Sequence, residues 1–221
     1  RPLGVVSMEP LFRHRRRNSE RRQRERYLAT DKESLRWIRM VDDIEEHCGQ
    51  ALDLVHLMDS EADWYDLLDH LYRQEHRFVV RMTHDRVLLG TRGQRLGSTP
   101  SDLLDRVRAV AKREVVLSRR TGKGKAPNSK KKHGPRQART AQLEIAARSV
   151  TIARPVGSVA LSESITVNLV QVREVKTPAG CEPVHWLLAT TEAIDNVEEI
   201  LTVVDHYRAR WLIEEFFKSL K

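Results

Sequence analysis

In the first half of the chain, short apolar runs alternate with stretches in which apolar residues recur every three or four positions. The runs at 51–58 and 77–82 are bounded by turn residues and predict two buried strands. The stretch between them predicts a helix that begins at Ser60, with Asp63 in its first turn and one apolar face. That face comprises Trp64, Leu67, Leu68, Leu71 and Tyr72.

Two further elements precede these. Residues 2–8 are apolar and predict a short strand, and the capping-box pattern at 30–33 predicts a helix that ends near Gly49. The resulting order is strand, helix, strand, helix, strand. It favours an α/β core with a mixed or parallel sheet.

The pattern changes after about residue 85, where strand-like stretches follow one another between Gly, Pro and basic turns. Pro100, after Thr99, predicts a short helix. We therefore predict a β-rich insertion over 85–185, between a first core part at 1–84 and a second at 186–221. The second part is expected to close with one long helix over 196–221. The strands expected in the insertion cover 114–118, 142–153, 165–175 and 184–190.

Composition bounds the class of protein. The chain has 221 residues and 40% hydrophobic content, which is enough for a core. No apolar run reaches the length of a membrane span, and no signal-peptide pattern is present. The two cysteines lie far apart and lack zinc-site spacing, so we expect free thiols in a reducing cytoplasm. Because Arg1 stands where an initiator Met is usual, we expect a fragment of a longer protein.

The net charge of +8 is concentrated in two segments. Residues 13–26 contain eight arginines and only two acids. Residues 115–143 contain nine Lys or Arg and no acid, with Lys130–Lys132 at their centre. Such segments neutralise the phosphates of a polyanion. The alternative is that both segments are solvated loops that only keep the protein soluble.

Near the C-terminus, Tyr207, Arg210, Glu214 and Lys221 are spaced Y-x2-R-x3-E-x6-K. On one helix they fall within an arc of roughly 60°, at about 100° per residue. Burying such charges is costly unless they meet a metal, a phosphate or each other. The alternative is an ordinary helix stabilised by pairing of Arg210 with Glu214 at i,i+4.

Asp59 stands where the strand at 51–58 ends and a helix begins, in Asp59-Ser60-Glu61-Ala62-Asp63. Ligands of open α/β sheets bind beyond the carboxyl ends of strands, which favours a ligand-binding role for Asp59. The alternative is that Asp59 only helps to cap the helix. This stretch and the C-terminal quartet together resemble the signatures of the bacterial DDE transposases of the insertion-sequence-4 family, which cut and paste DNA. The resemblance covers most of the chain outside the insertion.

The resemblance implies a ribonuclease-H-like fold interrupted by a β-sheet insertion before the Glu-bearing helix. It assigns Asp59 and Glu214 as two of three metal-binding carboxylates. Their hard oxygens suit Mg²⁺, with Mn²⁺ as a substitute, and Glu61 and Asp63 are expected as helix-dipole partners. The first catalytic Asp would lie upstream of Arg1, so the N-terminal strands of that fold would be missing. Asp42 and Asp43 lie within a predicted helix and are poor substitutes.

The resemblance also implies contacts with DNA. Arg210 would grip a phosphate in a bidentate manner, Tyr207 would bind the same backbone, and Lys221 would place a charge near the cleaved strand. Trp186 would stack on a flipped base of a transposon end, and Arg81 would contact DNA beside that base. The expected partners are double-stranded transposon ends and target DNA, with a homodimer in the full-length synaptic complex. The expected location is the bacterial cytoplasm, near the nucleoid.

Three functions are compatible with these residues. The first is a Mg²⁺-dependent transposase that nicks, forms hairpins and transfers strands. The second is a non-catalytic DNA-binding remnant of a truncated transposase, without the first Asp. The third is a structure-selective nuclease of the same fold or an RNA-binding protein, which the C-terminal quartet disfavours. An Asp at the end of an apolar strand, encoded within about sixty codons upstream, would favour the enzyme. A truncated gene and a partial chain both remain compatible with the sequence.

Overall fold

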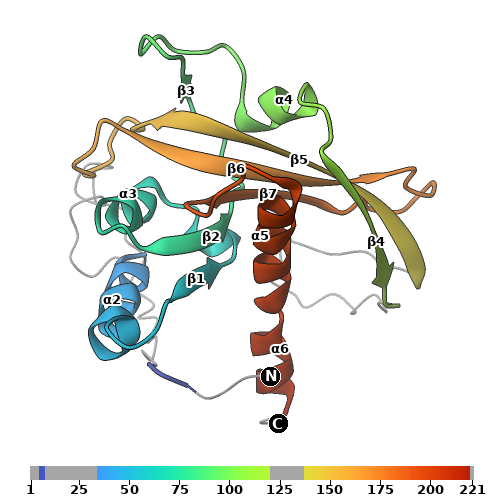
Figure 1. The fold of residues 1–221 in the computed structure, drawn as a ribbon, viewed down its shortest axis with the longest axis horizontal. Helices are drawn as coiled ribbons and strands as arrows, with labels where there is room; N and C mark the ends of the chain where they lie inside the picture. The colour runs from blue at the N-terminus through green and yellow to red at the C-terminus, as the bar shows by residue number, and fades with distance from the viewer. Residues whose placement is uncertain (1–4, 8–33, 120–136, 220–221) are drawn as a thin grey trace, which may run out of the picture.

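The computed structural model describes residues 5–7, 34–119 and 137–219. Within them, seven strands form one mixed sheet in the order β1-β2-β7-β6-β5-β3, with β4 paired to β5 (Figure 1). β1 and β2 are parallel and the other pairs are antiparallel. The strands are β1 (Val55–Met58), β2 (Arg77–Arg81), β3 (Leu88–Leu89), β4 (Ala111–Leu117), β5 (Arg139–Ala153), β6 (Ser164–Val175) and β7 (His185–Thr190).

The first part of the chain follows the predicted α/β order. Helix α2 (Leu35–Ile44) continues into a π-helical turn, η1 (Glu45–Gly49), and packs on α3 (Tyr65–Arg73). Strand β1 is shorter than predicted: it starts at Val55, and the preceding residues at 51–53 are exposed. Leu67, Leu68 and Leu71 of the expected apolar face are buried, whereas Trp64 precedes α3 and is half-buried and Tyr72 is 39% exposed.

The start of α3 differs from the prediction. Ser60 does not cap it; instead, a 3-10 turn, η2 (Ser60–Ala62), follows β1 and is capped by Asp59. α3 then begins at Tyr65. Asp63 therefore lies outside the first turn of a helix, and the prediction that it interacts with a helix dipole is wrong. Its buried side chain binds another segment instead, as described below.

The β-rich stretch after residue 85 is present and joins the same sheet. The strands β5 and β6 pair over twelve positions, from Gln142–Val175 to Ala153–Ser164. Helix α4 (Pro100–Asp105) begins as predicted, with a capping box in which Thr99 and Asp102 bond each other's backbone N–H. At the start of β5, Arg139 makes a bidentate pair with Glu174 that leaves their side chains 11% and 2% exposed. Arg139 was counted above within a basic segment, but its guanidinium stabilises the fold through this ion pair.

The expected single helix at the C-terminus is two helices. α5 (Val197–Ala209) is capped by Asn196, and α6 (Leu212–Ser219) follows after a turn at Arg210 and Trp211. Hydrogen bonds there run from residue i to i−3, which tightens the turn. The buried side chains of α5 end at Tyr207, so the chain beyond it has no sheet beneath it. The exposed apolar side chains of this end are Trp211, Leu212, Ile213 and Phe217.

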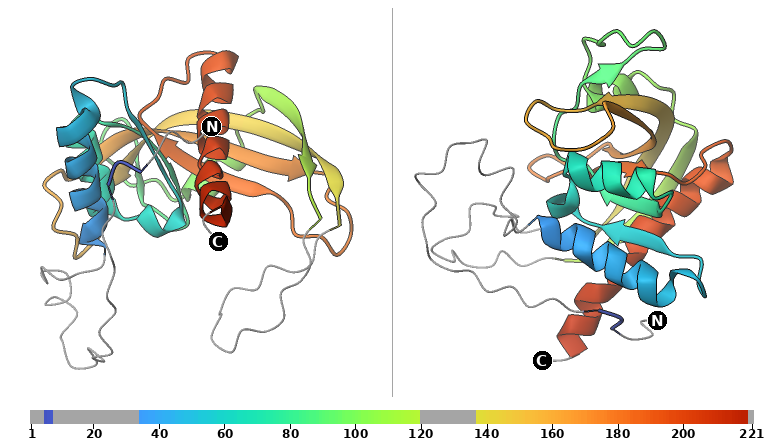
Figure 2. Two further views of the ribbon diagram at one scale, coloured as in Figure 1. Left: turned by 90° about the horizontal axis from the view of Figure 1, so that it is seen from below. Right: turned by 90° about the vertical axis from the view of Figure 1, so that its left-hand side faces the viewer.

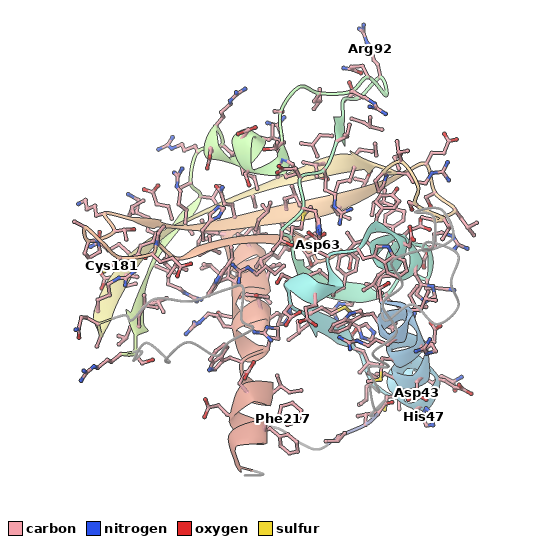
Figure 3. The ribbon with its side chains drawn as sticks, turned by 180° about the vertical axis from the view of Figure 1, so that it is seen from behind. Asp43, His47, Asp63, Arg92, Cys181 and Phe217 are labelled. Carbon is pink, nitrogen blue, oxygen red and sulfur yellow. The ribbon has the colours of Figure 1, made fainter. Side chains whose placement is uncertain are left out.

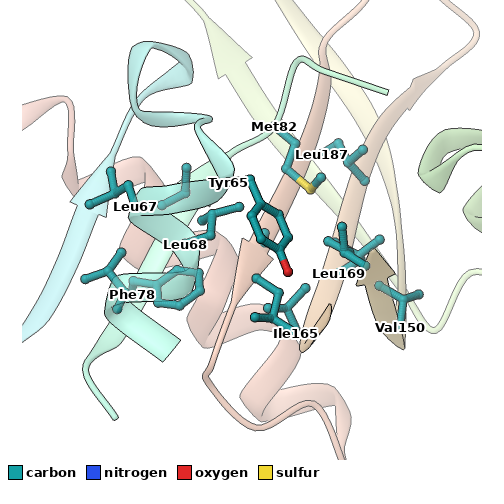
Figure 4. Close-up of a cluster of buried hydrophobic side chains, with 14 of the residues drawn as sticks. Tyr65, Leu67, Leu68, Phe78, Met82, Val150, Ile165, Leu169 and Leu187 are labelled. Atoms are coloured by element: carbon teal, nitrogen blue, oxygen red, sulfur yellow. The ribbon is translucent and has the colours of Figure 1, made fainter. Parts of the chain in front are cut away.

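Two hydrophobic cores cover the two faces of the sheet. One lies under α3 and α4 and is centred on side chains such as Tyr65, Leu68 and Leu169 (Figure 4). The other lies under α5, where Ile200, Val203 and Val204 pack on the strands. Figure 2 shows α5 crossing its face of the sheet, with α2 and α3 to one side. The sheet is therefore a shared middle layer that holds both helical layers in place.

Several predictions fall largely outside the described residues. These are the strand at 2–8, the capping box at 30–33, the whole basic segment at 13–26 and residues 120–136 of the second basic segment. Val5–Ser7, the described part of the first of these, is not in a strand. Among the described strands, β1 pairs only with β2 and forms one edge of the sheet.

The core under α3 yields a stability prediction. Leu68 is fully buried, so Leu68→Ala should lower the free energy of unfolding by about 2–5 kcal/mol through lost burial and a residual cavity. Arg73→Ala, at the exposed end of the same helix, should change it by no more than about 0.5 kcal/mol. Urea unfolding of both variants measures the difference. Equal losses would contradict the placement of this helix face.

Candidate functional site

Asp59 lies at the carboxyl end of β1, at an edge where several candidate residues meet. Its Oδ1 accepts a hydrogen bond of 2.9 Å from the Glu61 N–H, which closes the η2 turn. Its side chain is 41% exposed. Asp59 is therefore held in place through one oxygen and remains open to solvent through the rest of the carboxylate.

The guanidinium of Arg210 approaches this carboxylate from the other end of the sequence. Its Nη1 lies 3.9 Å from Asp59 Oδ2, and its side chain is 19% exposed. It also lies over the ring of Tyr207, 5.8 Å from the ring centroid. Arg210 Nε is buried and has no hydrogen-bond partner within the described part of the chain.

Tyr207 and Trp186 form the apolar side of the same region. Their rings meet edge to face, with centroids 5.3 Å apart and planes at 63°. Tyr207 is 6% exposed, whereas Trp186 is half-buried on β7. This contact fixes the last turn of α5 against the sheet. Trp186 as a residue remains partly accessible to solvent.

Strand register brings Arg81 to the same edge. Met58 pairs with Val80 and Arg81 pairs with Leu188, so Arg81 lies beside the strand end that carries Asp59. Arg81 Nη2 donates to the carbonyl of His185, at 3.3 Å. Burial lowers the pKa of His185, and the positive charge of Arg81 lowers it further against the opposing effect of Asp105. The adjacent hollow of ≈ 270 Å³ is lined by Arg81, Met82, Thr83, His84, Asp85, Pro100, Ser101, His185 and Leu187.

Glu214 lies one turn beyond Arg210, in the first turn of α6. It is exposed, and its N–H bonds the carbonyl of Trp211 at 3.1 Å. The turn at 210–211 separates it from the helix that carries Tyr207, so the stripe expected on one continuous helix is interrupted. Lys221, the last member of the quartet, lies outside the described residues.

Asp63, four residues after Asp59, is the residue that sequence reasoning misplaced. Its side chain is fully buried and pairs with Arg86, which is 8% exposed. Its Oδ2 also accepts the N–H groups of Thr83 at 2.5 Å and His84 at 2.7 Å. Figure 3 shows Asp63 in the interior of the molecule. Burial alone raises the pKa of Asp63, but Arg86 and these donors outweigh it and hold the pKa below its usual value.

Two further aspartates on α3 behave like Asp63. Asp66 accepts the hydroxyl of Ser158, and Asp69 accepts the N–H groups of Leu161 at 3.0 Å and Ser162 at 3.3 Å. The sequence signal was the spacing of three acids at 63, 66 and 69 along the buried face of an amphipathic helix. Acids at such positions need partners from another segment. Glu61 instead pairs with Arg36 at 3.2 Å on the surface.

The acids set aside in the sequence analysis have other partners. Asp42 lies 2.7 Å from His70 Nε2, and Asp43 pairs with His47 on the outer side of α2 (Figure 3). Among the described residues, no three His, Cys, Asp or Glu side chains gather closely enough to hold a metal ion. The partly exposed carboxylates of Asp59 and Glu214 have the hard oxygens that suit Mg²⁺.

The family model described as "Transposase DDE domain" matches residues 29–221. The chain therefore belongs to the family of transposase DDE domains. Membership implies transposase function in general, with chemistry of the polynucleotidyl transferase or nuclease type, a divalent metal and DNA as partner. The mixed α/β fold agrees with the ribonuclease-H-like architecture general to these domains. No helix within the described ranges is long and apolar enough to cross a membrane.

Two substitutions of Tyr207 distinguish the packing role of its ring from a binding role of its hydroxyl. Within the described residues, the Tyr207 hydroxyl makes no hydrogen bond, whereas the ring is buried. Tyr207→Ala should lower the free energy of unfolding by about 3 kcal/mol or more. Tyr207→Phe keeps the ring and should change it by less than about 1 kcal/mol. Urea unfolding tests both, and a Phe variant as unstable as the Ala variant would contradict packing through the ring.

Proposed function

We propose that this chain is part of the catalytic domain of a DNA transposase of the insertion-sequence-4 family, with Asp59 and Glu214 as two of its metal-binding carboxylates. The observation that carries the proposal is the approach of Arg210 to Asp59. It unites the strand-end motif and the C-terminal quartet, which are about 150 residues apart, at one edge of the sheet. A third carboxylate would come from an Asp upstream of Arg1.

Each residue has a role in this proposal. Bound Mg²⁺ would activate a water or a 3′-hydroxyl and stabilise the leaving oxygen of the DNA backbone. Arg210 would bind a phosphate, and the Tyr207 hydroxyl would bind the same strand. Trp186 and Arg81 would hold a flipped base and its neighbouring backbone at the same edge. Lys221 would add positive charge near the cleaved strand.

The proposed activity comprises nicking, hairpin formation and strand transfer at transposon ends. These steps act on double-stranded DNA and take place within a homodimeric synaptic complex of the full-length protein. The domain organisation proposed from the sequence places the basic insertion at 85–185 between the two catalytic carboxylates.

A second candidate function is that of a non-catalytic DNA-binding remnant. It follows if Asp59 and Glu214 act without the third carboxylate of the set, because the metal site would then be incomplete. The remnant would keep the basic segments and Arg210 for binding DNA but would not cleave it. The two candidates differ in cleavage by a protein that also carries the upstream segment.

Substitution of Glu214 tests the metal site. Glu214→Gln keeps the shape of the side chain but removes the charge that holds a cation. It should weaken Mn²⁺ binding to this chain by about tenfold or more, measured by electron paramagnetic resonance. Glu215→Gln makes the same change one residue along α6 and should leave Mn²⁺ binding nearly unchanged. Equal effects would contradict the assignment of Glu214.

Cleavage gives the corresponding test of activity. A protein that includes the upstream Asp should cleave transposon-end DNA in Mg²⁺, and Glu214→Gln should abolish cleavage while end binding remains. The 221-residue chain itself should not cleave DNA in Mg²⁺ or Mn²⁺. Metal-dependent cleavage by this chain would show that another carboxylate, such as Asp42 or Asp43, completes the site. Undiminished cleavage by the longer Glu214→Gln protein would overturn the proposed mechanism.

Binding to DNA should depend steeply on salt. Each neutralised phosphate contributes a slope of about −0.9 to the log–log plot of affinity against salt. Replacement of Lys130, Lys131 and Lys132 by Gln should make this slope shallower by up to about 3, measured by fluorescence anisotropy with a short duplex. Arg73→Gln, at the exposed end of α3, serves as a control for the loss of a positive charge elsewhere on the surface. An unchanged slope in the triple variant would show that these lysines do not contact DNA.

A further inference from the structure

The turn that carries Asp59 is connected to the linker between β2 and β3 by a buried polar network. The network contains the side chain of Asp63, the guanidinium of Arg86 and the backbone N–H groups of Thr83 and His84. Arg86 also donates to the backbone carbonyl of Asp63, at 3.1 Å. Both the side chain and the main chain of Asp63 are therefore bound to a segment about twenty residues further along the chain.

The short turn between Asp59 and Asp63 has little support of its own. Its internal bonds are the Asp59 cap on Glu61 N–H and the backbone bonds from Ala62 N to Asp59 O at 3.1 Å and from Asp63 N to Ser60 O at 3.4 Å. A single 3-10 turn is weakly stable in isolation because it closes few bonds. The position of Asp59 thus depends on what fixes the far end of the turn.

We propose that Asp63 and Arg86 are positioning residues for Asp59, acting through the turn at 59–63. The proposal rests on the function proposed above, in which Asp59 binds a metal ion. One end of the turn continues from β1, and the other end is pinned by Asp63 to the linker that leads into the insertion. Residues that line the hollow beside Arg81 lie in this linker, so a displacement of the linker would be transmitted to the turn that holds Asp59.

The test compares two buried aspartates, Asp63 in the turn before α3 and Asp69 on α3. In Asp63→Asn, the amide oxygen can still accept from Thr83 and His84, but the amide nitrogen faces Arg86 and the ion pair is lost. Asp69→Asn, by contrast, removes an acceptor for Leu161 or Ser162 in a different loop. The readout is amide hydrogen exchange of the 221-residue chain, followed on peptides that cover 59–64, 155–163 and β6.

Asp63→Asn should accelerate exchange at 59–64 by about tenfold or more beyond any change in β6. Asp69→Asn should accelerate exchange at 155–163 and spare 59–64. Adding Arg86→Gln to Asp63→Asn supplies a neutral acceptor for the Asn amide and should restore protection at 59–64. A merely structural contribution would raise exchange in all three segments together and would give no selective rescue. Such a uniform change, or equal effects of the two aspartate variants on 59–64, would overturn the proposal.

If Asp63→Asn does not fold, the double variant and Arg86→Gln alone decide the question. Native-like protection at 59–64 in the double variant, with faster exchange in Arg86→Gln, supports positioning by the pair. Loss of protection in the double variant overturns it. The exchange readout requires neither metal nor DNA. Its failure would therefore leave the proposed metal role of Asp59 intact, and failure of Mn²⁺ binding would leave the exchange result intact.

Discussion

The carboxylate of Asp63 and the guanidinium of Arg86 are buried against each other, 0% and 8% exposed. A charge removed from water in this way costs several kcal/mol unless its hydrogen-bonding capacity is met. Here the guanidinium supplies the countercharge and the Thr83 and His84 N–H groups supply further donors. Because the lowered pKa keeps Asp63 ionised, the linker and the turn cannot separate without exposing an unpaired charge. This constraint fixes the chain directly after Asp59.

The rest of the site follows from the sheet. Parallel pairing of β1 with β2 sets Asp59 beside Arg81, and antiparallel pairing of β2 with β7 brings Trp186 to the same edge. The Trp186 ring contacts the Tyr207 ring edge to face, and this contact holds the last turn of α5 against the sheet. Arg210, three residues later, emerges where it can reach Asp59. Strand register and one aromatic contact thus assemble residues that are scattered over the sequence.

Sequence periodicity predicted the helices and strands that are marked by a local pattern of apolar residues. The strands β4, β5, β6 and β7 were anticipated to within a few residues and the buried face of α3 was recognised, because apolar alternation and a helical apolar face report burial directly. The break at 210–211 was not anticipated, since neither residue is a Gly or Pro and the apolar pattern continues through it. That break occurs where the sheet ends, which is a property of the tertiary structure.

The same reasoning explains which site residues could be predicted. The position of Asp59 at the end of a strand could be predicted because a strand end is a local feature of the sequence. The role of Asp63 was missed because local capping rules consider only the adjacent backbone, whereas its partner Arg86 follows 23 residues later. Arg139 was counted within the basic segment at 115–143 for a similar reason, because its partner Glu174 is on the next strand. Long-range ion pairs leave little periodic signal in a sequence.

Two aspartates four residues apart are therefore suited to different tasks. The pairing of Asp59 with Arg210 is long, at 3.9 Å, and 41% of the Asp59 side chain is exposed, so this contact contributes at most about 1 kcal/mol. A cation or a phosphate can rearrange such a pair at little cost. Asp63 is fully buried and saturated with donors, so exchanging its partner would be far more costly. In the proposed function, the accessible carboxylate of Asp59 would change partners during the reaction while the buried Asp63 holds the backbone still.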